Sequence, residues 1–303
     1  MDIQGVLDDV AEAIRPQRGQ GVVADYIPSL ASVPPDRFGM ALAMNDGELC
    51  GVGDWEAPFS IQSISKAFTL SLALAMDGVA LWSRVGRESS SFAFSSLAQL
   101  EVGEGVPRNP FVNAGALVVT DRLLSLTGSA QESLLDFMRT ETGNPAIAVD
   151  RDIAASEAEH GHRNAAIAHL LASYGKLDNP VDAVLEEYFA QCSIAMSCRD
   201  LAVAGGFLSR GGIRRDGSAF LDRSTAKRIN SVLLISGTYD SAGEFAYRVG
   251  LPAKSGVGGG ILAMIPGRGT ICVWGPGLGD SGTSVAGLAA LDEFTTRTGW
   301  SVF

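Results

Sequence analysis

A long apolar helix is predicted to begin at residues 62–66, Gln-Ser-Ile-Ser-Lys, where a serine and a lysine stand three residues apart. The run 67–76 that follows is rich in alanine and leucine, so most sides of this helix must be buried, which constrains the fold around it. Positions i and i+3 share a helix face, so Ser63 and Lys66 can meet in the first turn. Burial lowers the pKa of a lysine, and such an amine can activate a serine without histidine. The alternative is an ordinary helix with a capping serine and a solvated lysine, against which the apolar neighbours of Lys66 argue.

A second motif stands far downstream, where residues 254–257 read Lys-Ser-Gly-Val and precede Gly258, Gly259 and Gly260. Glycines let a backbone approach a substrate closely, and a backbone N–H in such a turn can stabilise an oxyanion. A plain Gly-rich turn between strands is the alternative. A phosphate-binding loop is disfavoured, because that motif needs glycine directly before its lysine and Ala253 stands there. S-x-x-K followed by a K-T-G-like element is the signature set of serine β-lactamases and penicillin-binding proteins.

The charge balance excludes several classes of partner. The chain has 303 residues, with 23 basic and 34 acidic side chains and a formal net charge of −11. Nucleic acids and anionic membranes both require a basic surface, so neither is an expected partner. Because 46% of the residues are apolar, the chain can bury a sizeable core.

Cysteine usage and the N-terminal residues predict a cytoplasmic protein. The four cysteines are widely spaced and form no C-x-x-C pair, so reduced thiols are expected. Residues 1–4 show neither the basic n-region nor the apolar h-region of a signal peptide. No apolar run reaches the roughly 18 residues that a membrane span needs.

Strand patterns at both ends of the chain flank a helical middle. Residues 37–53 read as a hairpin around a turn at 45–47, and strands are expected at 244–250, 260–265 and 269–274 before a closing helix at 282–297. Helical patterns dominate residues 62–235. The simplest α/β (α+β) architecture is a single domain, 1–303, with an antiparallel-sheet lobe from both termini (about 1–61 and 236–303) and an inserted helical lobe (about 62–235). The nucleophile helix then sits at the lobe boundary, where clefts form.

Three helix starts are legible in the sequence. Asn109 and Asn179 each precede a proline, as a cap residue before the first helical position does. Ser197 with Asp200 resembles a capping box in which Asp replaces Glu.

Several polar residues in the helical segment are candidates for a binding site. Asn113 follows a predicted cap, and its amide bonds either the local backbone or a ligand. Glu157 is either part of a binding site or a solvated surface charge, and Asn164 is either part of a binding site or the cap of the helix that follows it. His160 and His162 invite a metal site, but no cysteine is nearby and the chain has three histidines, so no metal is expected.

Three tyrosines differ in their surroundings. Tyr188 falls on an apolar helix face, so packing in the core is its default role. Tyr239 lies in a turn, where a tyrosine is more apt to present its hydroxyl to a site. Tyr26 is open to either loop packing or function.

Taken together, these segments resemble the serine-dependent glutaminases, the bacterial and mitochondrial enzymes that deamidate glutamine. The resemblance covers most of residues 20–290 in family order, in the stretches 25–28, 59–66, 109–116, 156–164, 188–193 and 239–260. It implies a β-lactamase/transpeptidase-like fold, no cofactor, and a homodimer or homotetramer. It makes Ser63 the nucleophile and Lys66 its base. The glutamine site that it implies comprises Tyr26, Gln62, Ser63, Asn113, Glu157, Asn164, Tyr188, Tyr239 and Val257.

One segment departs from the family pattern. Where the family usually has Glu-Pro-Ser-Gly after Arg-Val-Gly, this chain has Glu88-Ser89-Ser90-Ser91, so it loses a proline and a glycine from that loop. The ankyrin extension and long N-terminal region of the animal enzymes are absent from this sequence.

The resulting hypothesis is hydrolysis of L-glutamine to L-glutamate and ammonia through an ester on Ser63. Lys66 would be the base, Lys254 would help to keep it neutral, and Tyr239 or Tyr188 would relay a proton to the leaving ammonia. Backbone N–H groups of Ser63 and Val257 would form the oxyanion hole. Two alternatives are a serine hydrolase of the β-lactamase or peptidase type and a non-catalytic glutamine sensor.

Overall fold

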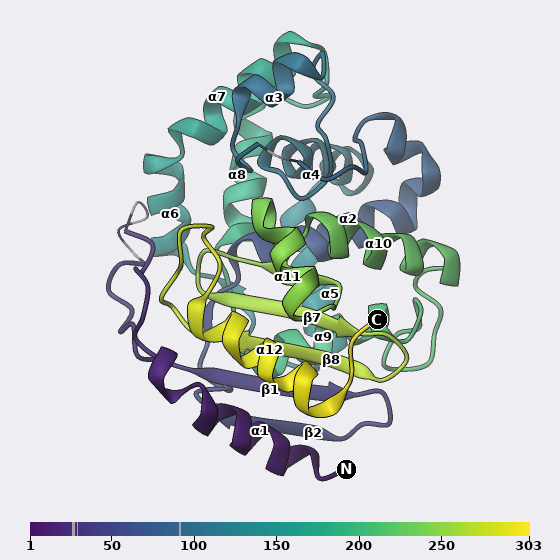
Figure 1. The fold of residues 1–303 in the computed structure, drawn as a ribbon. Helices are drawn as coiled ribbons and strands as arrows, with labels where there is room; N and C mark the ends of the chain where they lie inside the picture. Colours follow the sequence, from purple (N-terminus) through teal and green to yellow (C-terminus); the bar gives the residue numbers. More distant parts are fainter. Residues whose placement is uncertain (26–27, 29, 91) are drawn as a thin grey trace.

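The computed structural model describes residues 1–25, 28, 30–90 and 92–303. Its centre is a five-stranded antiparallel sheet with the strand order β2-β1-β8-β7-β6 (Figure 1). β1 and β8 pair along their whole length, from Gly39 opposite Trp274 to Met44 opposite Gly269, so the two ends of the chain meet inside the sheet. The five strands are β1 (Gly39–Met44), β2 (Leu49–Gly53), β6 (Ala253–Ser255), β7 (Gly260–Ile265) and β8 (Gly269–Trp274).

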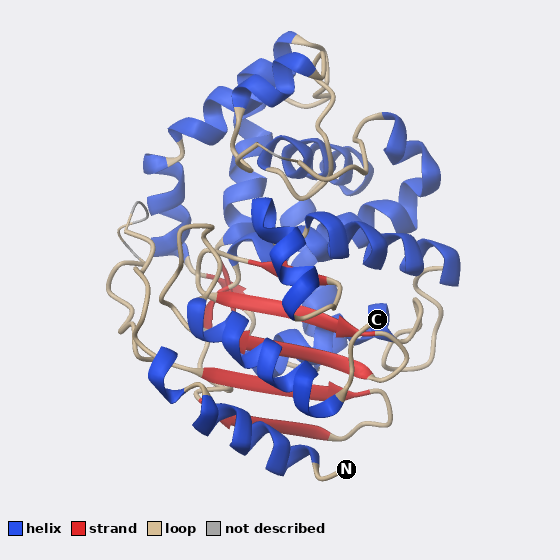
Figure 2. Cartoon of the chain, viewed as in Figure 1, coloured by secondary structure: helices blue, strands red, loops and turns tan. Residues whose placement is uncertain are grey.

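Helices cover both faces of this sheet. α1 (Ile3–Ala13) and α12 (Val285–Thr298) lie across one face, in front of the strands in Figure 2. α9 (Cys198–Ser209) packs on β1, β7 and β8 from the other face. Successive strand residues point to opposite faces, so Met40 and Leu42 join the core under α1 and α12, while Ala41 joins the core that includes α9.

The rest of the chain is mainly helical and stands on one side of the sheet (Figure 1). α2 (Ser65–Asp77) is central and contacts α4, α5 and α10. A small sheet in the order β3-β5-β4 joins β3, the strand before α2, to this region. The other elements are β3 (Phe59–Ser60), β4 (Ala148–Val149), β5 (Ile194–Met196), α3 (Leu97–Val102), α4 (Asn113–Thr127), α5 (Ala130–Thr142), α6 (Arg151–His160), α7 (His162–Ser173), α8 (Val181–Cys192), α10 (Arg223–Ser236), α11 (Ala242–Arg248) and the 3₁₀ turns η1 (Arg15–Gln17), η2 (Gln62–Ile64), η3 (Gly78–Ser83) and η4 (Tyr239–Ser241).

Several local predictions are confirmed. β1 and β2 form the hairpin around residues 45–47, and β7 and β8 pair around the turn at 266–268. Ser197 and Asp200 form the capping box of α9 in both directions. The lobe boundaries near residues 61 and 236 stay a prediction; α9, from the middle segment, packs on the sheet.

The strand predicted at 244–250 is wrong, because this segment is mostly helix α11. Phe245 and Val249 are four residues apart and both buried, whereas Tyr247 between them is 87% exposed. A strand would put these three side chains on one face, whereas a helix separates Tyr247 from the other two.

Two predicted caps are also wrong in detail. α4 begins at Asn113, and the side-chain oxygen of Asn109 instead accepts from the N–H groups of Phe111 and Val112 in the preceding turn. α8 begins after Pro180, and the amide of Asn179 bonds the side chain of Asp121 at 2.9 Å.

The expectation that no apolar stretch reaches the length of a membrane span is wrong as well. Because 3₁₀ turns extend α2 at both ends, the helical stretch Gln62–Ser83 has 22 residues and is apolar enough to cross a membrane by length and composition. However, 67% of its most apolar window is buried inside the protein, which is the environment of a core helix.

Candidate active site

The proposed nucleophile, Ser63, lies in η2, in the tight turn that leads from β3 into α2. Gln62 directly before it has a φ of 49°, a left-handed conformation that costs a non-glycine residue free energy and marks a constrained turn. Two hydrogen bonds hold this turn: Ile61 N–H donates to Ile194 O at 2.9 Å, and Gln62 Nε2 donates to Ser60 Oγ at 3.0 Å. The segment that leads into Ser63 is therefore held in place by these hydrogen bonds.

Lys66 lies in the first turn of α2 and is 4% exposed. Its Nζ donates to Asn113 Oδ1 at 2.7 Å and to the carbonyl oxygen of Phe111 at 3.2 Å. Burial lowers the pKa of Lys66 from 10.5 to about 8, although Cys192 and Glu157 act in the opposite direction. An amine with such a pKa is partly neutral near pH 7–8 and can accept a proton.

The glycine turn between β6 and β7 rests directly on residues 60–61, which lead to Ser63. A Cβ on Gly256 would lie 2.6 Å from the carbonyl oxygen of Ile61, and one on Gly258 would lie 2.3 Å from that of Ser60. Only glycine allows this approach. Within the described part of the chain, the N–H groups of Ser63 and Val257 donate no hydrogen bond, so both are available to a ligand.

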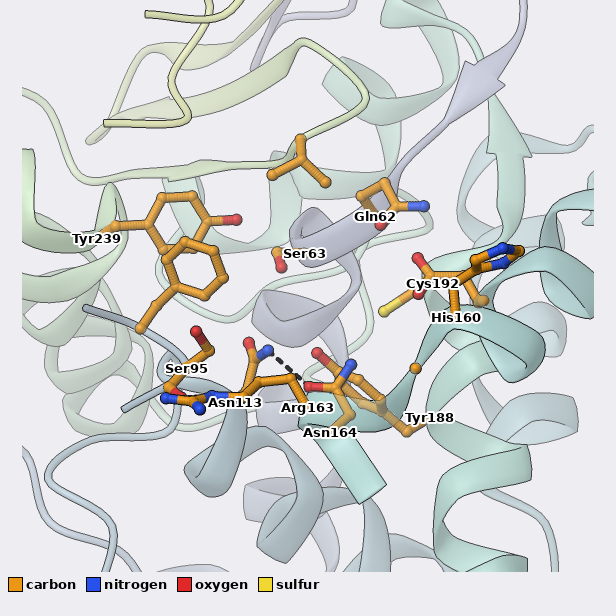
Figure 3. Close-up of a pocket in the computed structure, with 14 residues that line it drawn as sticks. Gln62, Ser63, Ser95, Asn113, His160, Arg163, Asn164, Tyr188, Cys192 and Tyr239 are labelled. Atoms are coloured by element: carbon orange, nitrogen blue, oxygen red, sulfur yellow. Dashed lines mark hydrogen bonds between the residues drawn. The ribbon is translucent and has the colours of Figure 1, made fainter. Parts of the chain in front are cut away.

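Tyr239 reaches the same place from η4, and Figure 3 shows its hydroxyl pointing toward Ser63. Its φ of 60° is another left-handed backbone conformation. The hydroxyl donates to Ser255 O at 3.2 Å. Burial raises the pKa of Tyr239, and hydrogen bonds with Ser63 and Ser255 partly offset this rise, so the phenol keeps its proton at neutral pH.

Lys254 lies behind Tyr239 and is fully buried. Its Nζ is 4.1 Å from the centre of the Tyr239 ring and donates to Gly237 O and Ser255 O, both at 2.7 Å. Burial, followed by the positive charge of Lys66, lowers the pKa of Lys254 well below its usual value. Burial is the largest cause of the lowered pKa of Lys66, and the predicted contribution of Lys254 to it stays a prediction.

Two asparagines and a glutamate face the other half of the site. Asn113 Nδ2 donates to Asn164 Oδ1 at 2.8 Å, which links the start of α4 to α7 (Figure 3). Glu157, on α6, is 7% exposed rather than solvated. Burial raises the pKa of Glu157, and a hydrogen bond with Gln62 and the charge of Lys66 oppose the rise.

These side chains surround one cavity of about 260 Å³. It brings together eight of the residues predicted for the substrate site: Gln62, Ser63, Asn113, Glu157, Asn164, Tyr188, Tyr239 and Val257. Tyr188 lines the cavity although its side chain is part of the core and only 4% exposed. Lys66 and Lys254 are buried behind the cavity wall. Tyr26 lies outside the described residues.

Comparison with known proteins assigns the fold and the family. A family model described as Glutaminase matches residues 21–303. The chain belongs to the glutaminase family. It is 62% identical to a glutaminase of Streptomyces coelicolor over 298 residues, covering 98% of this chain and 97% of that protein. The predictions of a glutaminase, an amidohydrolase, and of a β-lactamase-like α/β fold are confirmed.

Solved structures of glutaminases superpose closely on this chain. A probable glutaminase named ybaS has a TM-score of 0.91 at 32% identity, with 100% of this chain and 99% of that one covered. A probable glutaminase from Bacillus subtilis, complexed with 6-diazo-5-oxo-L-norleucine, has a TM-score of 0.89 at 30% identity, with 100% and 98% covered.

The sequence reasoning missed six residues that line the cavity: Phe94, Ser95, His160, Gly161, Arg163 and Cys192. Three of them lie inside the glutaminase-like stretch 156–164, and Cys192 follows Tyr188 by one helical turn, so their positions carried a signal. Phe94 and Ser95 had none, because they reach the cavity on an irregular loop. The ring of Phe94 packs 4.5 Å from that of Tyr239.

The segment that departs from the glutaminase pattern is held by specific contacts. Asn109 Nδ2 donates to Glu88 O at 2.8 Å, and Arg108 Nε donates to Ser89 O at 3.1 Å. Ser90 Oγ accepts from Gln99 Nε2 at 2.9 Å. Ser91 lies outside the described residues.

His160 and His162 do not form part of a metal site in the described residues, among which no group of three His, Cys, Asp or Glu side chains is placed to hold an ion. His160 Nδ1 lies 3.0 Å from Ser156 O within its own helix.

Proposed function

We propose that this protein hydrolyses L-glutamine to L-glutamate and ammonia through a γ-glutamyl ester on Ser63. The observation that carries the proposal is a cavity lined by Ser63 and Val257, whose backbone N–H groups have no partner, with a buried lysine of lowered pKa one helical turn after the serine. Family membership supports it, as does the amino-acid derivative bound by the similar Bacillus subtilis protein.

In the first step, neutral Lys66 takes the proton of Ser63 Oγ while that oxygen attacks the side-chain carbonyl carbon of glutamine. Two N–H bonds of Lys66 Nζ point at Asn113 Oδ1 and Phe111 O, which leaves its lone pair for the serine proton. The negative oxygen that develops on the substrate accepts from the N–H groups of Ser63 and Val257. Each such donor is worth about 3 kcal/mol of transition-state stabilisation.

The leaving nitrogen must gain a proton before the C–N bond breaks. Tyr239 suits this step better than Tyr188, because its hydroxyl points toward Ser63 and it keeps its proton at neutral pH. Lys66 then passes the proton that it took from Ser63 to the Tyr239 oxygen, which restores the phenol. Water then attacks the ester, its proton passes to Lys66, and its oxygen becomes part of the γ-carboxylate of glutamate as Ser63 Oγ leaves protonated.

The far half of the cavity fits the head group of an α-amino acid. Glu157 supplies a carboxylate for the substrate ammonium, and Asn113 and Asn164 supply amide donors for its carboxylate, with Tyr26 a further predicted donor. A cavity of about 260 Å³ lies just below the usual size range of small-molecule sites, as suits one amino acid. A head group fixed this way sets the distance between the substrate's α-carbon and Ser63, and this distance favours glutamine over the shorter asparagine.

Ammonia release from purified protein tests the proposal, with L-glutamine and L-asparagine as substrates and a Ser63→Ala variant alongside. We expect release from glutamine that the variant abolishes, and an intact-mass gain of one glutamyl group on rapid quenching of the wild type. Tight glutamine binding without ammonia would instead indicate a sensor. Acylation by a fluorescent penicillin, without glutamine turnover, would indicate the β-lactamase or peptidase class. Cytoplasmic location and a homodimer or homotetramer remain proposals.

A further inference from the structure

The cavity holds one permanently charged cation for which the proposed mechanism has no use. Among the described residues that line the cavity, Arg163 alone carries a guanidinium, and no carboxylate in the described chain lies within salt-bridge distance of it. The Arg163 side chain is exposed, so its guanidinium is accessible to a ligand that enters the cavity. It lines the cavity next to Asn164, in the half that the proposed function assigns to the substrate head group.

One contact already orients the guanidinium. Arg163 Nε donates to the carbonyl oxygen of Ser95 at 2.9 Å, across from α7 to the loop before α3. A guanidinium has five N–H donors in a planar fork, and this bond uses one of them. The two terminal nitrogens remain free to bind the two oxygens of a carboxylate side by side.

The break between two helices places opposite charges around the cavity. α6 ends at His160 and α7 begins at His162, and a Cβ on Gly161 would lie 2.4 Å from the ring of Phe189, so the chain can bend here only at a glycine. Glu157 stands before this bend and Arg163 after it, and both line the cavity. A negative and a positive side chain thus face a substrate that carries both charges.

We propose that Arg163 recognises the α-carboxylate of the substrate and so restricts the enzyme to free α-amino acids. This inference rests on the proposed function, because it assigns a residue to the head group of glutamine. Asn113 and Asn164 offer neutral donors, whereas Arg163 adds a full positive charge.

The test compares two amides in wild-type protein and in Arg163→Gln. L-glutamine carries the α-carboxylate, and 4-aminobutanamide is the same molecule without it. Loss of a charged hydrogen bond costs roughly 1.5–3 kcal/mol, so we expect kcat/KM for glutamine to fall about 10- to 100-fold, mainly through KM. The kcat/KM for 4-aminobutanamide should stay within about threefold. Arg151→Gln, which removes the same charge from the exposed start of α6, should change neither value.

An equal fall for both amides would overturn the proposal, because it would show that Arg163 serves only to hold Ser95. No change for either amide would overturn it too. Calorimetry with the products keeps the test independent of turnover: Arg163→Gln should weaken L-glutamate binding and leave 4-aminobutanoate, which lacks the α-carboxylate, unaffected. Failure of glutamine hydrolysis in the wild type would therefore refute the proposed function without deciding the role of Arg163.

Discussion

Lys66 Nζ and Asn113 Oδ1 lie 2.7 Å apart, so an amide from the start of α4 fixes the amine that stands one helical turn after the proposed nucleophile. The same asparagine donates to Asn164. One side chain therefore joins the chemical half of the cavity to the half that fits the substrate head group, and a change at this residue should affect both.

Asn113→Asp places a carboxylate against the Lys66 ammonium and should raise the pKa of Lys66 above about 8. The proposed base must be neutral, so a raised pKa leaves less of it active at any given pH. We expect the rising limb of kcat/KM against pH to move to higher pH, by one unit or more. The pH–rate profiles of the two proteins check this, and a limb that stays in place would argue against Lys66 as the base.

Tyr239→Phe removes the hydroxyl that points toward Ser63 and keeps the ring that packs on Phe94. Loss of a general acid typically costs about 10²- to 10⁴-fold in rate, so we expect kcat to fall in that range with little change in melting temperature. Tyr188→Phe is the matched comparison, with a smaller expected loss. Equal losses would leave Tyr239 without its assigned role, and a larger loss in Tyr188→Phe would transfer the relay to that residue.

Glu157→Gln removes the buried carboxylate proposed to bind the substrate ammonium. We expect KM for glutamine to rise about 10- to 100-fold with a smaller change in kcat. Because burial raises the pKa of Glu157, the wild type should also lose affinity as the pH falls toward this pKa and the carboxyl gains a proton. Glu159→Gln, on the exposed side of the same helix, is the control and should behave as wild type.

Lys254→Met fills the space of the lysine and removes one hydrogen bond from each of the carbonyl groups of Gly237 and Ser255, which keep Ser255 N–H and the Tyr239 hydroxyl as donors. Each lost hydrogen bond contributes about 0.5–1.5 kcal/mol, so chemical denaturation should show a loss of unfolding free energy. Catalysis should slow because the Tyr239 turn loses its support. The pH dependence of kcat/KM should nevertheless keep its position, since burial rather than Lys254 lowers the pKa of Lys66. A profile shifted to higher pH would support the predicted role of Lys254 in keeping Lys66 neutral.

The sequence was most informative where chemistry and backbone geometry coincide locally. Ser63 and Lys66 share one helical turn, and the capping box at Ser197 is complete within four residues, so both could be predicted from spacing alone. The glycines at 256–258 were recognisable as a close approach, although their partners, Ser60 and Ile61, could not be known from spacing.

Contacts between distant segments were not predictable in the same way. Phe94 lies on a loop without periodicity, and its packing on Tyr239 depends on the path of both segments. The strand expected at 244–250 failed because a seven-residue helix gives too short a pattern to separate the two periods. Asn179 looked like a cap, but the buried carboxylate of Asp121, from another helix, binds its amide instead.

The glycine turn at 256–259 rests on the segment before Ser63, and β8 pairs with both β1 and β7. In each case a segment from the C-terminal part of the chain completes a structure that begins in the N-terminal part. On the ribosome, Ser63 and Lys66 emerge early, when neither Val257 nor Tyr239 has been made. A nascent or C-terminally truncated chain thus carries the proposed nucleophile but lacks part of the proposed oxyanion hole and the proposed proton relay. We therefore expect that an incomplete chain cannot hydrolyse glutamine until its last strands have joined the sheet.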